Sequence, residues 1–222
     1  MENFKVAITT RNRPNELERV LIEVTKYVNE RDIIIVDDAS DIEYCKSDYR
    51  FETRAGIPRA KNKCISLFME TNSEHLFLLD DDTMPIHQDA FSRYIESPYD
   101  HLCYTFLPDH GKLPDHKTHS LGNGCMLYLS RKCIDTVGGF DVSFGMGKYE
   151  HSLYSRQAHK SGLIPHPFID VIGSDKLWYC LDQEKGHKRI FTNQEMTNLL
   201  NSGRKHFYDS LKKPFAFTNY ID

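Results

Sequence analysis

Short apolar runs alternate with amphipathic segments along the first part of the chain. Three runs have the length of strands buried on both faces and lack polar alternation: 5–9, 32–36 and 75–79. Two longer segments between them, 15–27 and 58–69, carry apolar residues at helical spacing. This alternation predicts an α/β fold with a mostly parallel central sheet and helices on both faces.

Acidic residues directly follow two of these apolar runs. Asp37 and Asp38 end the second run, and Asp80, Asp81 and Asp82 end the third. Ligands of open α/β sheets bind outside the carboxyl ends of the strands. Clustered carboxylates repel one another unless a cation or a donor-rich ligand neutralises them. The acids therefore predict a ligand site at this edge of the sheet.

The first strand ends in residues that suit phosphate binding. Thr9, Thr10 and Arg11 offer hydroxyl and guanidinium groups at the same edge. Proteins typically hold Mg²⁺ or Mn²⁺ through one or two carboxylates together with substrate phosphates. The residues at the three strand ends thus indicate a nucleoside-diphosphate site that uses Mn²⁺ or Mg²⁺.

The composition is that of an ordinary globular protein. The chain has 222 residues, of which 40% are hydrophobic and 27% charged, and its formal net charge is −4, so its overall charge does not favour polyanions. No apolar run approaches the roughly 20 residues that span a bilayer, and no signal peptide follows Met1. Six cysteines without a CxxC pair are interpreted as reduced core residues. We expect a cytoplasmic protein, at most peripheral at a membrane.

Several segments, in a fixed order, resemble family 2 glycosyltransferases of the GT-A fold. They are 6–14, 35–40, 56–62, 78–85, 122–126 and 138–141, then Tyr149-Glu-His with Arg156 and Gly162. The resemblance covers about residues 4–175. It implies a GT-A fold with a Rossmann-like nucleotide-binding half, and transfer of a sugar from a nucleotide-sugar donor to an acceptor hydroxyl.

The resemblance also implies roles on the donor side. Thr9, Thr10 and Arg11 match the loop that holds the nucleotide, and Asp38 matches the aspartate that accepts from the base, commonly uracil. Four further positions match residues near the ribose and the phosphates: Arg59, Lys61, Asp80 and Asp81. Asn62 matches a frequent asparagine in this region, with helix packing as the alternative role.

The family's DxD motif corresponds to Asp80 and Asp82, of which Asp82 is implied to bind the metal and Asp80 to reach the ribose or share the metal. Family members often add a histidine ligand after the catalytic helix. His187 and Asp175, and also His166, are candidates for that further ligand, and none of them matches clearly.

Glu150 and His151 match the family's catalytic pair, but His151 stands where an aspartate usually acts as the base. A histidine can also serve as a base, since its ordinary pKa lies near 6.5. We therefore predict that Glu150 and His151 act together and leave open which of them takes the proton. Attack from the face opposite the diphosphate would invert the anomeric carbon.

We expect a GT-A catalytic domain over 1–190, with a donor-nucleotide half (1–100) and an acceptor half (101–190), and a C-terminal helical extension over 191–222. Thr192 and Glu195 have the spacing of a capping box before a helix over 196–211. This basic and aromatic helix is expected either to pack with a solvated face or to cover the acceptor cleft.

Other functions stay open at this point. A non-catalytic module that binds a nucleotide sugar or carbohydrate would also use these residues. A sugar nucleotidyltransferase is disfavoured because residues 9–15 contain no glycine, and a dinucleotide-binding fold because no GxGxxG follows the first strand. Glycan, lipid-linked, protein and modified nucleic-acid acceptors are all compatible with the sequence, which also leaves the oligomeric state unknown.

Overall fold

The computed structural model describes residues 3–184 and 192–221. Its central sheet has six strands in the order β3-β2-β1-β4-β9-β6. Their bounds are β1 (Phe4–Thr10), β2 (Ile33–Asp37), β3 (Tyr49–Arg50), β4 (His75–Asp80), β6 (His101–Cys103) and β9 (Met126–Ser130). The first four strands of this order run parallel, whereas β9 runs antiparallel to both of its neighbours.

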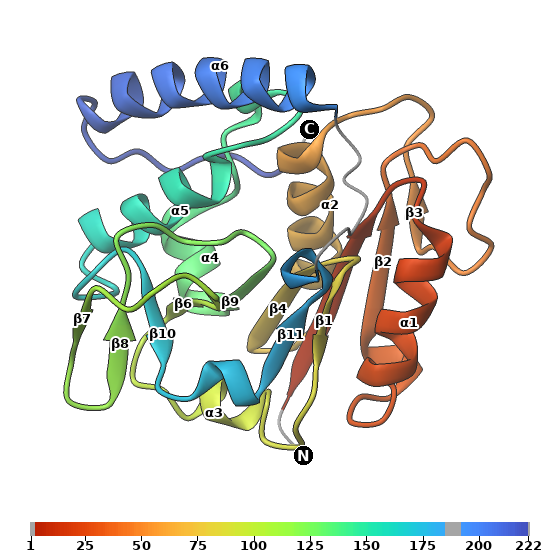
Figure 1. Cartoon of the computed structure of the whole chain (residues 1–222), viewed down its shortest axis with the longest axis horizontal. Helices are drawn as coiled ribbons and strands as arrows, with labels where there is room; N and C mark the ends of the chain where they lie inside the picture. The colour runs from red at the N-terminus through yellow and green to blue at the C-terminus, as the bar shows by residue number, and fades with distance from the viewer. Residues whose placement is uncertain (1–2, 185–191, 222) are drawn as a thin grey trace.

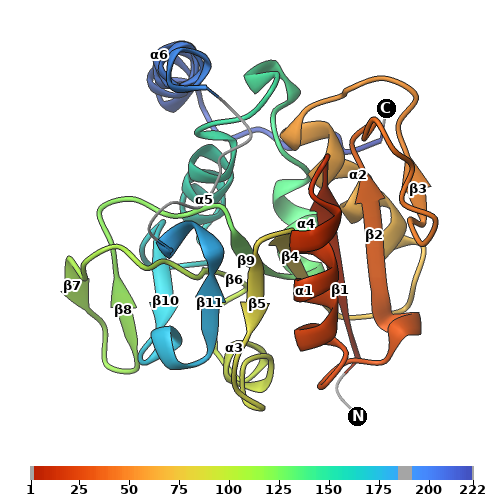
Figure 2. The ribbon, with the colours of Figure 1, turned by 45° about the vertical axis from the view of Figure 1, so that its right-hand side comes forward.

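Helices cover both faces of this sheet. The helices are α1 (Pro14–Val24), α2 (Ile57–Met69), α3 (Ser92–Ile95), α4 (Arg131–Val137), α5 (Glu150–Lys160) and α6 (Asn193–Leu211). Because β2 and β4 flank β1 on opposite sides, right-handed crossovers place α1 and α2 on opposite faces, as Figures 1 and 2 show. The predicted α/β fold with a mostly parallel, two-sided sheet is therefore confirmed.

Two small sheets complete the second half of the chain. One pairs β5 (Thr83–Pro85) with β11 (Trp178–Cys180), and the other contains β7 (Gly111–Lys112), β8 (His116–Thr118) and β10 (Ile169–Val171). Four short 3-10 helices are η1 (Glu30–Asp32), η2 (Val142–Phe144), η3 (Ser174–Lys176) and η4 (Leu181–Gln183). The β5–β11 pair brings the end of the acceptor half back to the carboxyl end of β4.

The segments with strand-like and helix-like apolar patterns form the predicted strands and helices. Every residue of β2 is buried, and α1 turns Leu17, Val20, Leu21 and Val24 inward. Predicted and observed ends differ by at most three residues, the scatter expected where helix ends fray. Helix α5 has the predicted bounds, 150–160.

Helix α6 runs across the top of Figure 1, above α5, at the edge to which β1 and β2 point. Thr192 and Glu195 form the predicted capping box at its start. Phe207 packs on Phe144 and Leu153, while Arg204 and Lys205 are exposed. The helix thus packs with a solvated basic face; the division at residue 190 stays a prediction.

Within residues 3–184 and 192–221, no helix combines the length and the apolar character needed to cross a membrane.

Gly138 allows the C-terminal segment to pack beside α4. Its φ is +83°, and a Cβ on it would lie 1.9 Å from the Thr218 carbonyl oxygen. The neighbouring backbone holds the same segment, because Gly139 N–H donates to Thr218 O at 2.7 Å and Thr218 N–H donates to Val137 O at 3.0 Å.

We expect Gly138→Ala to release this segment and to lower stability by about 2–3 kcal/mol, since strain at positive φ and the clash add up. Thermal unfolding and limited proteolysis near residues 212–221 measure both effects. Gly162→Ala is the matched control, because Gly162 has φ +81° but nothing within 4 Å of the added Cβ. Equal losses in the two variants would mean that the contact with Thr218 contributes nothing.

Candidate active site

A cavity of about 180 Å³ lies at the carboxyl edge of the central sheet. Its charged lining residues are Lys61, Asp80, Lys148, Glu150, His151 and Asp182. Four of these are predicted site residues that come from α2, β4 and α5. The fold therefore brings the predicted Lys61 and Asp80 on the donor side together with the predicted catalytic pair.

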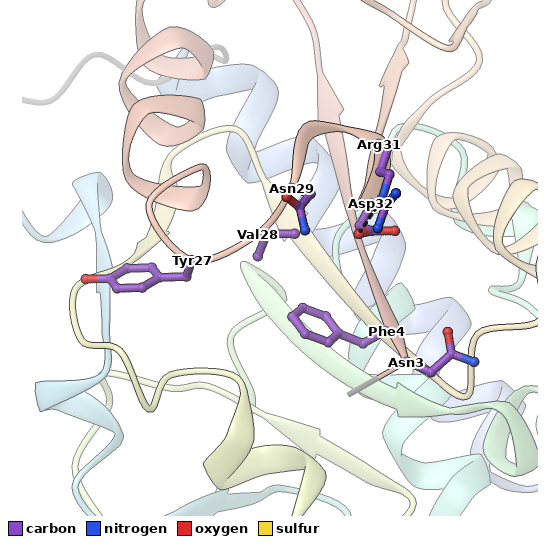
Figure 3. Close-up of a pocket in the computed structure, with 7 residues that line it drawn as sticks. All are labelled: Asn3, Phe4, Tyr27, Val28, Asn29, Arg31 and Asp32. Carbon is purple, nitrogen blue, oxygen red and sulfur yellow. Dashed lines mark ion pairs between the residues drawn. The ribbon is translucent and has the colours of Figure 1, made fainter. Parts of the chain in front are cut away.

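A larger hollow of about 640 Å³ lies at the opposite edge of the sheet, near the starts of β1 and β2 (Figure 3). Its charged residues already pair locally, because Asp32 lies 2.6 Å from Lys5 Nζ and 3.7 Å from Arg31 Nε. It contains none of the predicted site residues, and ligands of such sheets bind at the carboxyl edge. We therefore assign the functional site to the smaller cavity.

Lys61 joins the two sides of this cavity. Its Nζ donates to Gly124 O at 2.9 Å and lies 3.6 Å from both Asp80 Oδ1 and Glu150 Oε1. Burial by itself lowers the pKa of Lys61, but the two carboxylates outweigh burial and raise it. Lys61 is thus a permanent buried cation between Asp80, whose side chain is 35% exposed, and the fully enclosed Glu150.

Glu150 is an enclosed carboxylate at the first turn of α5. Burial would raise its pKa, but His151 and Lys61 together hold it far below its ordinary value, so Glu150 is ionised. Its Oε1 lies 3.2 Å from His151 Nδ1, and its Oε2 has no hydrogen-bond partner among the described residues. Burial of an unpartnered carboxylate oxygen is costly, which marks this oxygen as a candidate proton acceptor.

His151 faces a hydrogen-bond acceptor with each ring nitrogen. Nδ1 faces Glu150 Oε1, and Nε2 lies 3.0 Å from Gly122 O. The ring can donate to both only as an imidazolium, since a neutral ring has a single N–H. Both ring nitrogens are therefore engaged by oxygens of the protein.

The loop 122–124 lies close against this ring. A Cβ on Gly124 would lie 2.7 Å from His151 Nδ1, so only glycine permits the contact. The same residue accepts the hydrogen bond from Lys61 through its carbonyl. Gly124 therefore couples the position of His151 to that of the buried lysine.

Arg13 holds the other two acids of the cluster away from the cavity. Its Nη1 lies 2.8 Å from Asp81 Oδ1 and 2.9 Å from Asp82 Oδ2. Thr10 donates to Asp81 as well, at 2.8 Å. Burial raises the pKa of Asp81 to about 7, even though Arg13 opposes the rise. Asp82, the predicted metal ligand, is engaged by Arg13, a second guanidinium group of the segment 6–14 that the sequence offered for phosphate contacts or as a surface residue.

Asp38 lies at the same edge, beside the loop before α2. It accepts hydrogen bonds from Ala55 N–H at 2.6 Å and from Gly56 N–H at 3.1 Å, and Arg11 Nε donates to its backbone carbonyl at 3.1 Å. Burial raises the pKa of Asp38 despite these donors. Arg54 adds a cation close enough to Asp38 for their charges to interact.

The remaining predicted donor-side residues are close by but do not line the cavity. Thr9 pairs in register with Asp80 across β1 and β4, and Arg59 lies in the first turn of α2. Asn62 has the packing role, because its side chain donates to Phe140 O at 2.9 Å and accepts from Phe140 N–H at 2.7 Å.

Asp182 lines the cavity, although the sequence indicated other residues as candidates for a further metal ligand. Leu181 N–H donates to Asp82 O at 2.8 Å, which carries the following Asp182 into the cavity. Asp175 is exposed and precedes β11, at the far end of its pairing with β5, and His166 does not line the cavity. His187 lies outside the described residues. The sequence carried a signal for Asp182, because this acid closely follows an apolar strand, as Asp37 and Asp80 do at the ends of theirs.

Besides Glu150, which lies beside Lys61 and His151, two carboxylates line the cavity: Asp80 and Asp182. Across the described part of the chain, no three His, Cys, Asp or Glu side chains form a metal site by themselves. A divalent cation at this edge would therefore need oxygen ligands from a bound diphosphate, which is a common arrangement for Mg²⁺.

We expect Lys61→Met to destabilise the protein by about 2–4 kcal/mol at pH 7, because Glu150 loses its buried counter-charge and Asp80 is only partly exposed. Burial already raises the pKa of Asp80 although Lys61 opposes the rise, so without Lys61 this pKa rises further above its unfolded value, and the pKa of Glu150 loses one of the two side chains that lower it. The folded variant then binds protons that the unfolded chain releases, so its deficit relative to wild type narrows as the pH falls from 7 towards 5.

Chemical denaturation at several pH values measures this deficit. Lys63→Met, on the same helix, makes the same change in net charge, but Lys63 lies 4.2 Å from the Tyr49 ring centre and not in the cavity. A deficit that is independent of pH, or equal in the two variants, would refute the role of Lys61 as counter-charge.

Comparisons with known proteins agree with this geometry. No protein-family model matches the chain. An uncharacterized glycosyltransferase of Acanthamoeba polyphaga mimivirus is 26% identical over 169 residues, which cover 69% of this chain and 64% of that protein. The chain therefore spans less than two thirds of the length of this curated relative.

Solved structures share the fold at low sequence identity. The mannosyltransferase PcManGT of Pyrobaculum calidifontis, in complex with GDP-Man and Mn²⁺, has a TM-score of 0.54 at 14% identity over 69% of this chain and 52% of its own. A mutant Drosophila beta-1,4-galactosyltransferase 7, with manganese, UDP-Gal and xylobiose, has a TM-score of 0.55 at 15% identity over 99% of this chain and 84% of its own.

GalNAc-T7, solved with UDP, GalNAc and Mn²⁺, has a TM-score of 0.59 at 14% identity over 99% of this chain and 53% of its own. The resemblance seen in the sequence motifs is thus confirmed by a curated relative and by solved structures, all of them glycosyltransferases. The chain has the GT-A fold of nucleotide-sugar-dependent glycosyltransferases.

Proposed function

We propose that this chain is a glycosyltransferase that moves a sugar from a nucleoside-diphosphate sugar, preferably UDP-linked, to an acceptor hydroxyl, with a divalent cation and with inversion. One observation carries the proposal: Asp80, Asp182, Lys61 and Glu150 converge on one cavity at the carboxyl edge of a GT-A sheet. The Mn²⁺ and nucleotide sugars present in the complexes of the structurally similar glycosyltransferases support it.

Mn²⁺ or Mg²⁺ fits the donor set of the cavity. Asp80 and Asp182 offer hard oxygen ligands, and the diphosphate would supply the rest. When bound, such a cation stabilises the charge that grows on the leaving diphosphate. Lys61 and Lys148 add fixed positive charge beside the same cavity. Asp38, with Arg11 beside it, is the proposed contact for the uracil ring.

Glu150 is the better candidate for the base. It is ionised, and its Oε2 has no hydrogen-bond partner among the described residues, whereas both ring nitrogens of His151 already face acceptor oxygens. The acceptor proton would pass to Glu150 as the acceptor oxygen bonds to the anomeric carbon. The bond from that carbon to the diphosphate oxygen breaks, and the nucleoside diphosphate leaves. His151 would hold the carboxylate in place during this step.

The acceptor stays open among glycans, lipid-linked sugars, proteins and modified nucleic acids. The structure of the galactosyltransferase contains xylobiose, a carbohydrate, together with the donor and the metal, which supports a carbohydrate acceptor here. A non-catalytic binding module, the alternative considered above, would bind donor without cleaving it, so hydrolysis of UDP-sugars in the presence of Mn²⁺ distinguishes the two.

We expect UDP to bind at least tenfold more tightly with Mn²⁺ than with EDTA, because the cation bridges the diphosphate to the carboxylates. Isothermal titration of wild type, Asp80→Asn, Asp182→Asn and Asp82→Asn measures this gain. Loss of the gain in Asp182→Asn identifies the further ligand, and the Asp82 variant tests the predicted role of that residue.

Asp175→Asn is the control for these variants, since Asp175 is exposed and lies outside the cavity. GDP titrated in parallel tests the preference for uracil. Equal affinities for UDP with Mn²⁺ and with EDTA in the wild type would contradict the metal-dependent site.

Glu150→Gln should lower kcat by roughly 10²–10⁴-fold while UDP binding is kept, because the amide cannot take the acceptor proton. The kcat of His151→Asn should fall less than that of Glu150→Gln, since this change removes a residue that orients the base and not the base itself. Initial rates over pH 5–9 with both variants measure the difference. A larger loss in His151→Asn would transfer the base role to His151.

A further inference from the structure

Helix α5 starts from a backbone turn that non-glycine residues rarely adopt. Lys148 and Tyr149 have φ values of +76° and +71°, in the left-handed region. Tyr149 is the N-cap residue of α5, and its side chain makes no capping hydrogen bond. Such residues persist only where the surroundings hold them. Because Lys148 lines the cavity and Glu150 follows directly, this turn sets the geometry of the proposed catalytic pair.

Gly203 of α6 lies directly against this turn. A Cβ on Gly203 would lie 2.6 Å from the Lys148 carbonyl oxygen and 3.2 Å from Tyr149 Cδ2. Gly203 is buried in the interior of a 19-residue helix, where glycine is less favourable than alanine. The φ of Gly203 is not positive, so its backbone conformation does not require a glycine. The close approach to the turn is therefore the physical reason for a glycine here.

Other contacts join the same part of α6 to the segment around the turn. Arg204 Nε donates to the Tyr149 hydroxyl at 3.4 Å, and the rings of Phe207 and Tyr149 lie 5.5 Å apart. His206 Nε2 lies 2.8 Å from Asp141 Oδ2. Helix α6 thus contacts the turn in front of α5 along several residues, in agreement with its place above α5 in Figure 1.

We propose that Gly203 is a positioning residue of the active site: its close contact holds the Lys148–Tyr149 turn in the left-handed conformation and thereby orients Glu150 and His151. This inference rests on the proposed function for the role of that pair. Asp80 and Asp182 come from β4 and η4, so the two proposed metal ligands lie outside the turn that Gly203 contacts.

Gly203→Ala tests the inference, because the added Cβ must displace either α6 or the turn. We expect kcat to fall at least tenfold and the affinity for UDP with Mn²⁺ to fall clearly less than kcat, because Lys148 moves with the turn whereas Asp80 and Asp182 do not. Ser202→Ala, at the preceding and exposed position of the same helix, should leave kcat unchanged.

Hydrogen exchange supplies a readout that does not need turnover. The amide of Leu153, which donates to Tyr149 O, and those of the next turn of α5 should exchange at least tenfold faster in Gly203→Ala than in wild type, while those of β1 stay unchanged. An inactive wild type would refute the proposed function, yet exchange would still decide the positioning role. If Gly203→Ala has the same exchange rates and the same turnover as wild type, the inference is overturned.

A double-mutant cycle covers the case in which Gly203→Ala unfolds part of the protein. Tyr149→Gly removes the ring beside Gly203 and adopts positive φ freely. If Gly203 acts through the turn, adding Gly203→Ala to Tyr149→Gly should accelerate exchange at Leu153 and in the next turn of α5 less than it does in wild type. Additive effects would show that Gly203 acts elsewhere and would overturn the inference.

Discussion

The balance of charge at the carboxyl edge is the constraint on which the site depends. Three consecutive aspartates and Glu150 meet where solvent is scarce, and clustered carboxylates in such a place repel one another. Arg13 neutralises Asp81 and Asp82, and Lys61 lies between Asp80 and Glu150. The two cations divide the acids into a structural pair and a pair left to face the cavity.

The parallel sheet makes this division possible. Thr9 pairs with Asp80 in register, so the loop after β1 reaches the acids that follow β4. Asp81 then accepts from Thr10 and Arg13, while Asp80 stays partly exposed beside Lys61. Lys61 contacts Asp80 at the end of β4 and Glu150 at the start of α5. A change in the charge of either carboxylate therefore alters the electrostatic environment of the other.

Close backbone approaches complete the site where charge alone does not define a geometry. Gly124 lets the loop 122–124 lie against His151, and Gly203 lets α6 lie against the turn before Glu150. At both places a Cβ would come within 2.7 Å of another atom. Glu150 and His151 are therefore held from two directions by segments that are far apart in the chain.

The sequence alone determined the strands and helices between residues 4 and 80, and the edge of the sheet at which Asp38, Asp80 and Arg11 gather. These follow from local apolar periodicity and from the rule that parallel strands present their carboxyl ends together. Only the tertiary structure decided that Arg13 engages Asp82 and that Asp182 enters the cavity. Both depend on pairings between distant segments, such as Asp82 with Cys180, 98 residues apart, and no local pattern encodes such contacts.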